Sequence, residues 1–183
     1  MLIGGQITLR PVRADDIGPL HDSSLDLENR GLWYPLPTTP LAKFEADFAD
    51  SGFWTAGDGI LAIVDRSDRL VGIVGWEQLN GDIADIEVSN RLFDQADRGK
   101  GIVTEALGLL VGWLFDTGHA NRLRASVHVD NKASRRVAEK CGFSYEGTSR
   151  AGWYNRGQWH DIAVYSVTRA EFEDQRLAVA TPA

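Results

Sequence analysis

The feature that most constrains the fold of this chain is a long apolar helix pattern between two strand patterns. Residues 95–115 read QADRGKGIVTEALGLLVGWLF, and apolar side chains recur there at helical spacing as far as about Thr117. Residues 83–92 and 123–129 are typical of strands. A helix that connects two such strands in one sheet requires a right-handed crossover. The sequence therefore predicts a mixed sheet in an α/β or α+β domain.

The residues just before this helix pattern, Arg98-Gly99-Lys100-Gly101, are typical of an anion-binding loop. A helix N-terminus presents unpaired N–H groups and the positive end of its dipole, and glycines let the backbone approach an anion closely. Neither common phosphate loop matches, because Asp94 replaces the first glycine of the Walker pattern and Thr104 the third glycine of the dinucleotide pattern. An ordinary turn with a solvated basic face is the alternative.

The remaining patterns predict a sheet of about seven strands flanked by helices. Further strands are expected at residues 7–12, 59–65, 70–79, 144–152 and 160–168. Helices are expected from Asp15 and Asp16 to about Asn29, at 41–50, at 131–142 and from Glu171 onward. Prolines in the segment 33–37 predict a loop. We expect one domain over residues 1–175 and a frayed tail over 176–183.

The amino-acid composition indicates which kinds of ligand and which compartment suit this chain. The 183 residues carry a formal net charge of −7, which argues against general nucleic-acid or membrane binding and fits a cationic substrate such as an amine. The N-terminus lacks the apolar run of a signal peptide, and no stretch is long enough to span a membrane. With a single cysteine, the chain is expected to be cytoplasmic. Its four histidines and Cys141 show no metal-ligand spacing, so no metal site is predicted.

Several motifs resemble the GNAT superfamily of acyl-CoA N-acyltransferases. The loop Arg98–Val103 is similar to the pyrophosphate loop of that family, although Val103 departs from its final small residue. The run from Asn131 and Ser134 through EKCGF (139–143) to Glu146-Gly147 resembles one branch of the family. That branch holds the ribosomal-protein N-terminal acetyltransferases and many small-molecule relatives. The resemblance covers about residues 7–170.

The resemblance implies a GNAT-like fold, acetyl-CoA as cofactor and direct transfer of an acetyl group to a primary amine. The acceptor would be a protein N-terminal amine or a small molecule such as an antibiotic or polyamine, and a homodimer is compatible with it. A non-catalytic acyl-CoA-binding or regulatory module on the same fold is the alternative. The implied cofactor-binding residues are Leu92, Phe93, Arg98, Gly99, Lys100, Gly101, Ile102, Val103, Thr104, Asn131 and Ser134.

Glu87 is the candidate general base. An attacking amine must be neutral, and Glu87 matches the glutamate of a strand motif in the family. Asp85 shares its face of the strand by alternation and is a candidate substrate-binding residue. A strand glutamate that is only ion-paired or facing solvent is the alternative.

The proton donor is less clearly marked. Many relatives carry a tyrosine acid where this chain has Ala138, so the resemblance leaves Ser134 as a donor to the thiolate or a hydrogen-bond partner of the cofactor. A first-turn serine bonded to backbone is the alternative. Asn131 is expected to cap the helix and contact the cofactor. Cys141 is expected to fill the core, and His128 to be structural or substrate-facing.

Aromatic residues suggest an acceptor pocket. Trp33 and Tyr34 lie on the proline-rich loop, where the family places its acceptor wall, and Trp153 lies near the turn between the last two strands, as do Tyr154 and Trp159. Aromatic faces attract organic cations and stack on planar groups. Plain packing under long loops is the alternative.

Overall fold

The computed structural model describes residues 1–35, 38–80, 83–118 and 120–180. The described strands are β1 (Leu2–Ile3), β2 (Ile7–Pro11), β3 (Gly59–Asp65), β4 (Leu70–Asn80), β5 (Ile83–Leu92), β6 (Arg122–His128), β7 (Ser144–Asn155) and β8 (Gln158–Thr168). They pair in the order β1-β2-β3-β4-β5-β6-β8-β7. The predicted mixed, mostly antiparallel sheet is confirmed, with the two-residue β1 added to the expected strands.

The helices flank the strands, as expected from their apolar stripes. They are η1 (Ala14–Asp16), α1 (Ile17–Leu25), α2 (Leu27–Arg30), α3 (Leu41–Ser51), η2 (Gln95–Asp97), α4 (Ile102–Thr117), α5 (Lys132–Lys140) and α6 (Arg169–Ala180). No described helix is long and apolar enough to cross a membrane.

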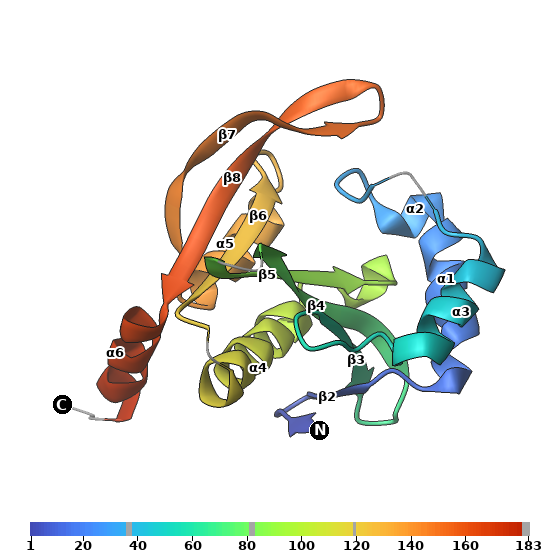
Figure 1. Ribbon diagram of the computed structural model, residues 1–183, viewed down its shortest axis with the longest axis horizontal. Helices are drawn as coiled ribbons and strands as arrows, with labels where there is room; N and C mark the ends of the chain where they lie inside the picture. Colours follow the sequence, from blue (N-terminus) through green and yellow to red (C-terminus); the bar gives the residue numbers. More distant parts are fainter. Residues whose placement is uncertain (36–37, 81–82, 119, 181–183) are drawn as a thin grey trace. The chain divides into compact units, whose positions relative to one another are not determined.

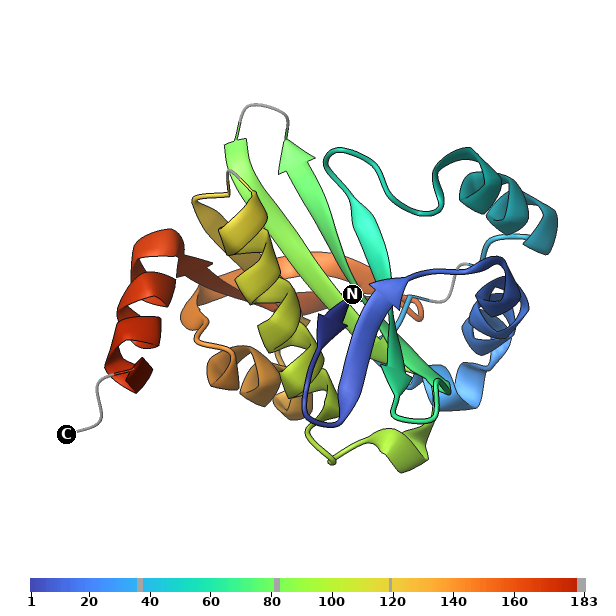
Figure 2. The same cartoon turned by 90° about the horizontal axis from the view of Figure 1, so that it is seen from below.

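The chain forms two compact units, the first of residues 1–77 and 89–109 and the second of residues 78–88 and 110–183. The single domain expected over residues 1–175 stays a prediction. In the first unit, α1 and α3 lie side by side (Figures 1 and 2). Val12, Ile17 and Leu20 form a buried cluster there, against which Phe44 and Phe53 pack.

In the second unit, β6 pairs in parallel with β5 and antiparallel with β8. The parallel pair is the one that the strand–helix–strand pattern predicts. Strands β7 and β8 continue as a long hairpin (Figure 1). Leu123, Tyr165 and Val167 are fully buried in this unit, because every second residue of a strand points to the same face.

The helix expected from Asp15 to Asn29 is interrupted. Asp26 has an extended backbone (φ −74°, ψ 90°), and its carboxylate accepts hydrogen bonds from the N–H groups of Glu28 and Asn29, at 3.1 and 3.0 Å. Asp26 therefore caps a separate helix, α2. Asp16 does not cap α1; its carboxylate instead accepts from the Arg13 N–H at 2.7 Å, at the start of η1, and pairs with the Arg10 guanidinium at 2.6 and 3.0 Å.

The turn between the last two strands is shorter than expected. Only Arg156 and Gly157 connect β7 to β8, with φ of 52° and 81°. Two-residue hairpin turns with positive φ match the twist of the strands. Trp153, Tyr154 and Trp159 lie near this turn, as expected, but within the longer strands β7 and β8.

The C-terminal helix also extends past residue 175, where the frayed tail was expected to begin. The Gln175 side chain donates to the Gly142 carbonyl at 3.2 Å, and Arg176 pairs with Asp116 at 2.7 Å. These contacts tie the last turns of α6 to the rest of the second unit. Residues 181–183 of the predicted tail lie outside the described residues, as do Leu36 and Pro37 of the predicted loop.

Candidate functional site

The glycine loop enters α4 in the conformation that its sequence predicts. Gly99 and Gly101 have φ of 75° and 83°, in the left-handed region that favours glycine. The helix begins at Ile102, and the N–H of Glu105 donates to the Gly101 carbonyl at 3.0 Å. The N–H groups of Ile102 and Val103, in the first turn, have no helical carbonyl four residues before them, because the chain before Ile102 is not helical. The loop thus offers backbone donors and a dipole end to an anion.

The two cations of the loop both have partners in the protein. Arg98 donates to the carbonyl of Asn29, and the Lys100 ammonium lies 3.2 Å from Asp97. The positive charges of Arg98 and Lys100, which the sequence suggested for binding an anion, therefore also interact with Asn29 and Asp97. The Gln6 side chain donates to the Lys100 carbonyl at 3.3 Å, which holds the loop beside the N-terminal strands.

Asp97 stabilises the glycine loop, a role that the sequence analysis did not predict. Its buried carboxylate accepts two bonds from Arg69, at 2.9 and 3.1 Å. These bonds, together with the bond from Lys100, hold the pKa of Asp97 below its ordinary value. No local motif marks this pair, because Arg69 lies directly before β4, far from Asp97 in sequence.

Most of the other predicted cofactor-binding residues of the first unit pack into the interior of the protein. Leu92 and Ile102 are buried, and Phe93 packs against the cluster around Leu20. The N–H of Phe93 donates to the Val71 carbonyl at 3.0 Å. Val103 and Thr104 lie in the first turn of α4. Their cofactor contacts stay predictions.

The two carboxylates of β5 both face arginines on β6. Parallel pairing aligns Asp85 with Arg122 and Glu87 with Arg124. Carboxylate and guanidinium lie 3.5 Å apart in the first pair and 4.0 Å apart in the second. Glu87 is therefore ion-paired, which is the alternative that the sequence left open. Its role as a general base stays a prediction. It is partly exposed, so its carboxylate remains accessible.

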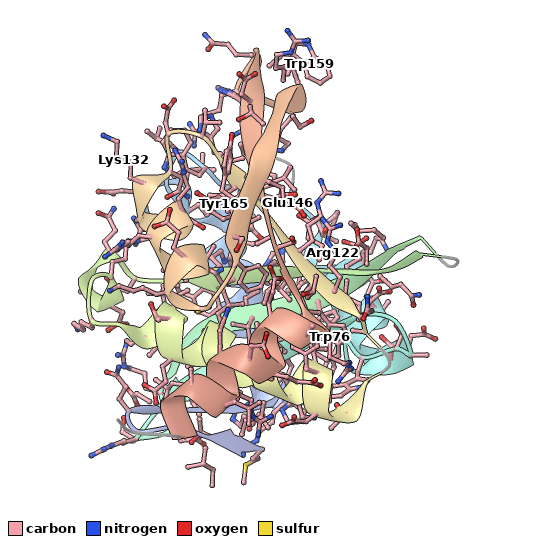
Figure 3. The ribbon with its side chains drawn as sticks, turned by 90° about the vertical axis from the view of Figure 1, so that its left-hand side faces the viewer. Trp76, Arg122, Lys132, Glu146, Trp159 and Tyr165 are labelled. Carbon is pink, nitrogen blue, oxygen red and sulfur yellow. The ribbon has the colours of Figure 1, made fainter. Side chains whose placement is uncertain are left out.

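Arg122 is shared between two acids. Its Nη2 also donates to Glu146 at 2.5 Å, and the other oxygen of Glu146 accepts from the Ser166 hydroxyl at 2.7 Å. Figure 3 shows Arg122 and Glu146 near each other on the second unit. This network fixes the strand face that carries Asp85. Glu146 stood out in the sequence only as part of a motif.

Asn131 and Ser134 meet at the start of α5. The Asn131 side-chain oxygen accepts from the Ser134 N–H at 3.1 Å, so the predicted cap is confirmed. The half-buried Ser134 makes no hydroxyl hydrogen bond to another described residue. The backbone-bonded alternative is therefore absent, and the hydroxyl can serve a ligand. Arg135 anchors this helix by bonds to Tyr165 and the Val129 carbonyl, at 2.9 and 3.1 Å.

His128 is buried at the end of β6. Its Nδ1 accepts from the Asp130 N–H at 3.1 Å, and burial lowers its pKa, so the ring is neutral at neutral pH with its proton on Nε2. The rings of His160 and Trp153 lie 4.8 and 6.2 Å from it, centroid to centroid. The ring centroids of Trp153 and His160 lie 6.0 Å apart, so Trp153 packs near both histidines. Trp159, by contrast, is exposed near the tip of the β7–β8 hairpin (Figure 3).

Comparison with known proteins identifies the family. A family model described as an acetyltransferase (GNAT) domain matches residues 6–144. The chain belongs to the GNAT acetyltransferase family. This confirms the resemblance drawn from the glycine loop and the Asn131 motif. Proteins of this family use acetyl-CoA as the acyl donor.

Several named acetyltransferases are similar to this chain. The probable N-acetyltransferase YjcK of Bacillus subtilis is 34% identical over 67% of this chain and 62% of its own length. The putative ribosomal N-acetyltransferase YdaF of Bacillus subtilis is 38% identical over 43% of each chain. The chain thus spans less than two thirds of the length of either relative. A spermidine N-acetyltransferase from Vibrio cholerae, solved with CoA and spermine, has a TM-score of 0.82 at 18% identity over 93% of this chain and 99% of its own, which shows the GNAT fold.

The Cys141 thiol and possible metal ligands were the remaining candidates for chemistry in the sequence. Burial raises the pKa of the Cys141 thiol to about 11, so the thiol is protonated at neutral pH and is a poor nucleophile. Across the described residues, no three His, Cys, Asp or Glu side chains gather closely enough to hold a metal ion.

Proposed function

We propose that this chain is an acetyl-CoA-dependent N-acetyltransferase that transfers an acetyl group directly to a primary amine. The observation that carries the proposal is the loop before α4, where two left-handed glycines precede the first N–H groups of a sixteen-residue helix. That geometry fits a pyrophosphate, and the family assignment makes CoA the expected source of it.

The residues of the second unit have separate roles in this proposal. Acetyl-CoA supplies an acetyl group on a thioester. Glu87, held by Arg124, accepts a proton from the incoming ammonium, directly or through water, so that the amine attacks as a neutral nucleophile. The Ser134 hydroxyl donates a hydrogen bond to the departing sulfur, and the Asn131 amide contacts the cofactor.

The acceptor is a protein N-terminal amine of the ribosomal type or a small-molecule amine. Ribosomal and spermidine acetyltransferases both occur among the similar proteins, which supports either class. Trp33, Tyr34, Asp85 and Trp153 are proposed to contact the acceptor. We further propose a cytoplasmic location and a homodimer, the second of which light scattering on the purified protein would test.

An acceptor screen tests the function. Purified protein is mixed with acetyl-CoA and a panel of amines and N-terminal peptides, free thiol is measured, and products are identified by mass. Release of CoA together with a product heavier by one acetyl group supports the enzyme. Calorimetric binding of CoA without turnover of any amine would support the non-catalytic module instead.

A further inference from the structure

Arg91 is a half-buried cation whose hydrogen-bonding capacity is only partly used. It lies near the end of β5, with its guanidinium carbon 4.6 Å from the centre of the Tyr34 ring and 4.8 Å from that of Phe93. Its Nη2 donates to the Ser23 hydroxyl at 2.5 Å. Its Nε and Nη1 are buried and have no hydrogen-bond partner among the described residues.

A second cation lies against the same ring. Arg30 is buried, and its guanidinium carbon lies 4.8 Å from the centre of the Tyr34 ring. Burial lowers the pKa of Arg91, and the charge of Arg30 acts in the same direction. Arginine nevertheless stays protonated at neutral pH. Two positive charges are thus gathered around one tyrosine.

The protein does not neutralise Arg91 itself. The chain has 26 acidic residues, yet no carboxylate of the described part of the chain forms an ion pair with Arg91. A buried charge with unmet donors is unfavourable, and such a group calls for a partner outside the protein. A guanidinium is planar and matches the geometry of a carboxylate. An ammonium ion placed here would meet two like charges instead.

We propose that Arg91, with Arg30 beside it, binds a carboxylate of the acceptor, so that the acceptor is a primary amine that also carries an acidic group. This inference rests on the proposed function, because it assigns Tyr34 to the acceptor wall. Since Nε and Nη1 are screened from water, the carboxylate reaches them by displacing part of the aromatic cover that Tyr34 provides. Polyamines are then poor acceptors, in spite of the negative charge of the whole chain.

The test uses primary amines in matched pairs, an amino acid or acidic peptide beside its carboxamide, together with spermidine. For each, kcat/KM is measured with acetyl-CoA on the wild type, on Arg91→Met and on the control Arg66→Met, which removes an exposed arginine of the same unit. The wild type should prefer carboxylates by at least about tenfold, since bonds to charged groups are the strong ones. Arg91→Met should abolish that preference, and Arg66→Met should keep it. Equal rates for acids and amides, or a preference for spermidine, would overturn the inference.

Thermal unfolding separates binding from a purely structural role. A cation whose buried donors lack partners should be replaceable, so Arg91→Met should melt at the same temperature as the wild type or higher. The same carboxylates should raise the melting temperature of the wild type and leave that of Arg91→Met unchanged. A lower melting temperature of the variant with no effect of carboxylates would make Arg91 structural. If no amine is turned over, the proposed function fails, and these shifts decide the carboxylate site independently.

Discussion

Arg69 and Asp97 form a two-point ion pair beneath the glycine loop, with N–O distances of 2.9 and 3.1 Å. Asp97 is buried, and it also accepts from Lys100 of the loop itself. Because Arg69 directly precedes β4 and Asp97 ends η2, the pair joins the loop to the sheet of the first unit. The loop that we propose for the pyrophosphate is thereby held before any ligand arrives.

Replacing this carboxylate should destabilise the protein. Asp97→Asn keeps the shape of the side chain but loses the charge that pairs with Arg69 and Lys100. We expect the free energy of unfolding at neutral pH to fall by about 2 kcal/mol, the scale of hydrogen bonds to a charged group. Urea unfolding followed by circular dichroism measures it, and Asp94→Asn, at an exposed position of the same turn, is the control.

The same pair predicts a pH dependence. The folded-state pKa of Asp97 is lowered, so on acidification the unfolded chain binds the proton first. The contribution to stability is therefore complete above the unfolded-state pKa of about 4 and is lost as pH falls through the folded-state value. The difference between wild type and Asp97→Asn should be constant near neutral pH and shrink below about pH 4. A difference that grew on acidification would contradict the assignment.

Gly101→Glu should weaken CoA binding at least tenfold, about 1.4 kcal/mol, because it places a negative charge where an anion approaches the backbone. Gly101→Ala is the matched control. Both substitutions strain the same left-handed position, and an added Cβ meets only the Gln6 side chain, at 3.6 Å. Calorimetry on both variants isolates the effect of the charge. Equal affinities of the alanine and glutamate variants would exclude the loop as the anion site.

Glu87→Gln should lower kcat by roughly 100-fold while the affinity for acetyl-CoA barely changes, the usual scale of general-base assistance. Arg124→Gln removes the ion-pair partner and leaves the carboxylate in place. We expect it to reduce kcat less than Glu87→Gln does, because the base itself remains. Steady-state rates over a range of pH measure both variants. Full activity of Glu87→Gln at every pH would remove it from the mechanism.

Ser134→Ala should slow the chemical step by about tenfold if its hydroxyl assists the leaving thiolate. The capping bond uses the Ser134 N–H, which alanine retains, so the melting temperature should hardly change. Asn131→Ala, which does remove the cap, should lower stability by about 1 kcal/mol. Single-turnover rates and melting curves on both variants distinguish the roles. An unchanged chemical step in Ser134→Ala would leave water as the proton source.

The sequence was most informative where structure is local. The left-handed glycines, the cap at Asn131 and the alternating strands depend on neighbours a few residues apart, and all were predictable. The sequence analysis missed that the helix ends at Leu25. Asp26 interrupts it because its carboxylate caps the next helix, α2. The pairs Arg69–Asp97 and Glu87–Arg124 join segments distant in sequence, so only the folded structure reveals them, the second through the parallel register of β5 and β6. Nothing in the residues around Arg91 shows that its partners are aromatic rings.

The carboxamide of Asn131 has two chemically different ends, and the structure uses only one. Its oxygen accepts the N–H of Ser134, and its amino end carries the N–H donors that a ligand would meet. A ligand that binds to that end must present an acceptor, such as a carbonyl oxygen. Asn131→Asp would keep the oxygen that caps α5 and remove the amino group of the side chain. This substitution therefore separates the role of Asn131 in the helix from its role toward a ligand.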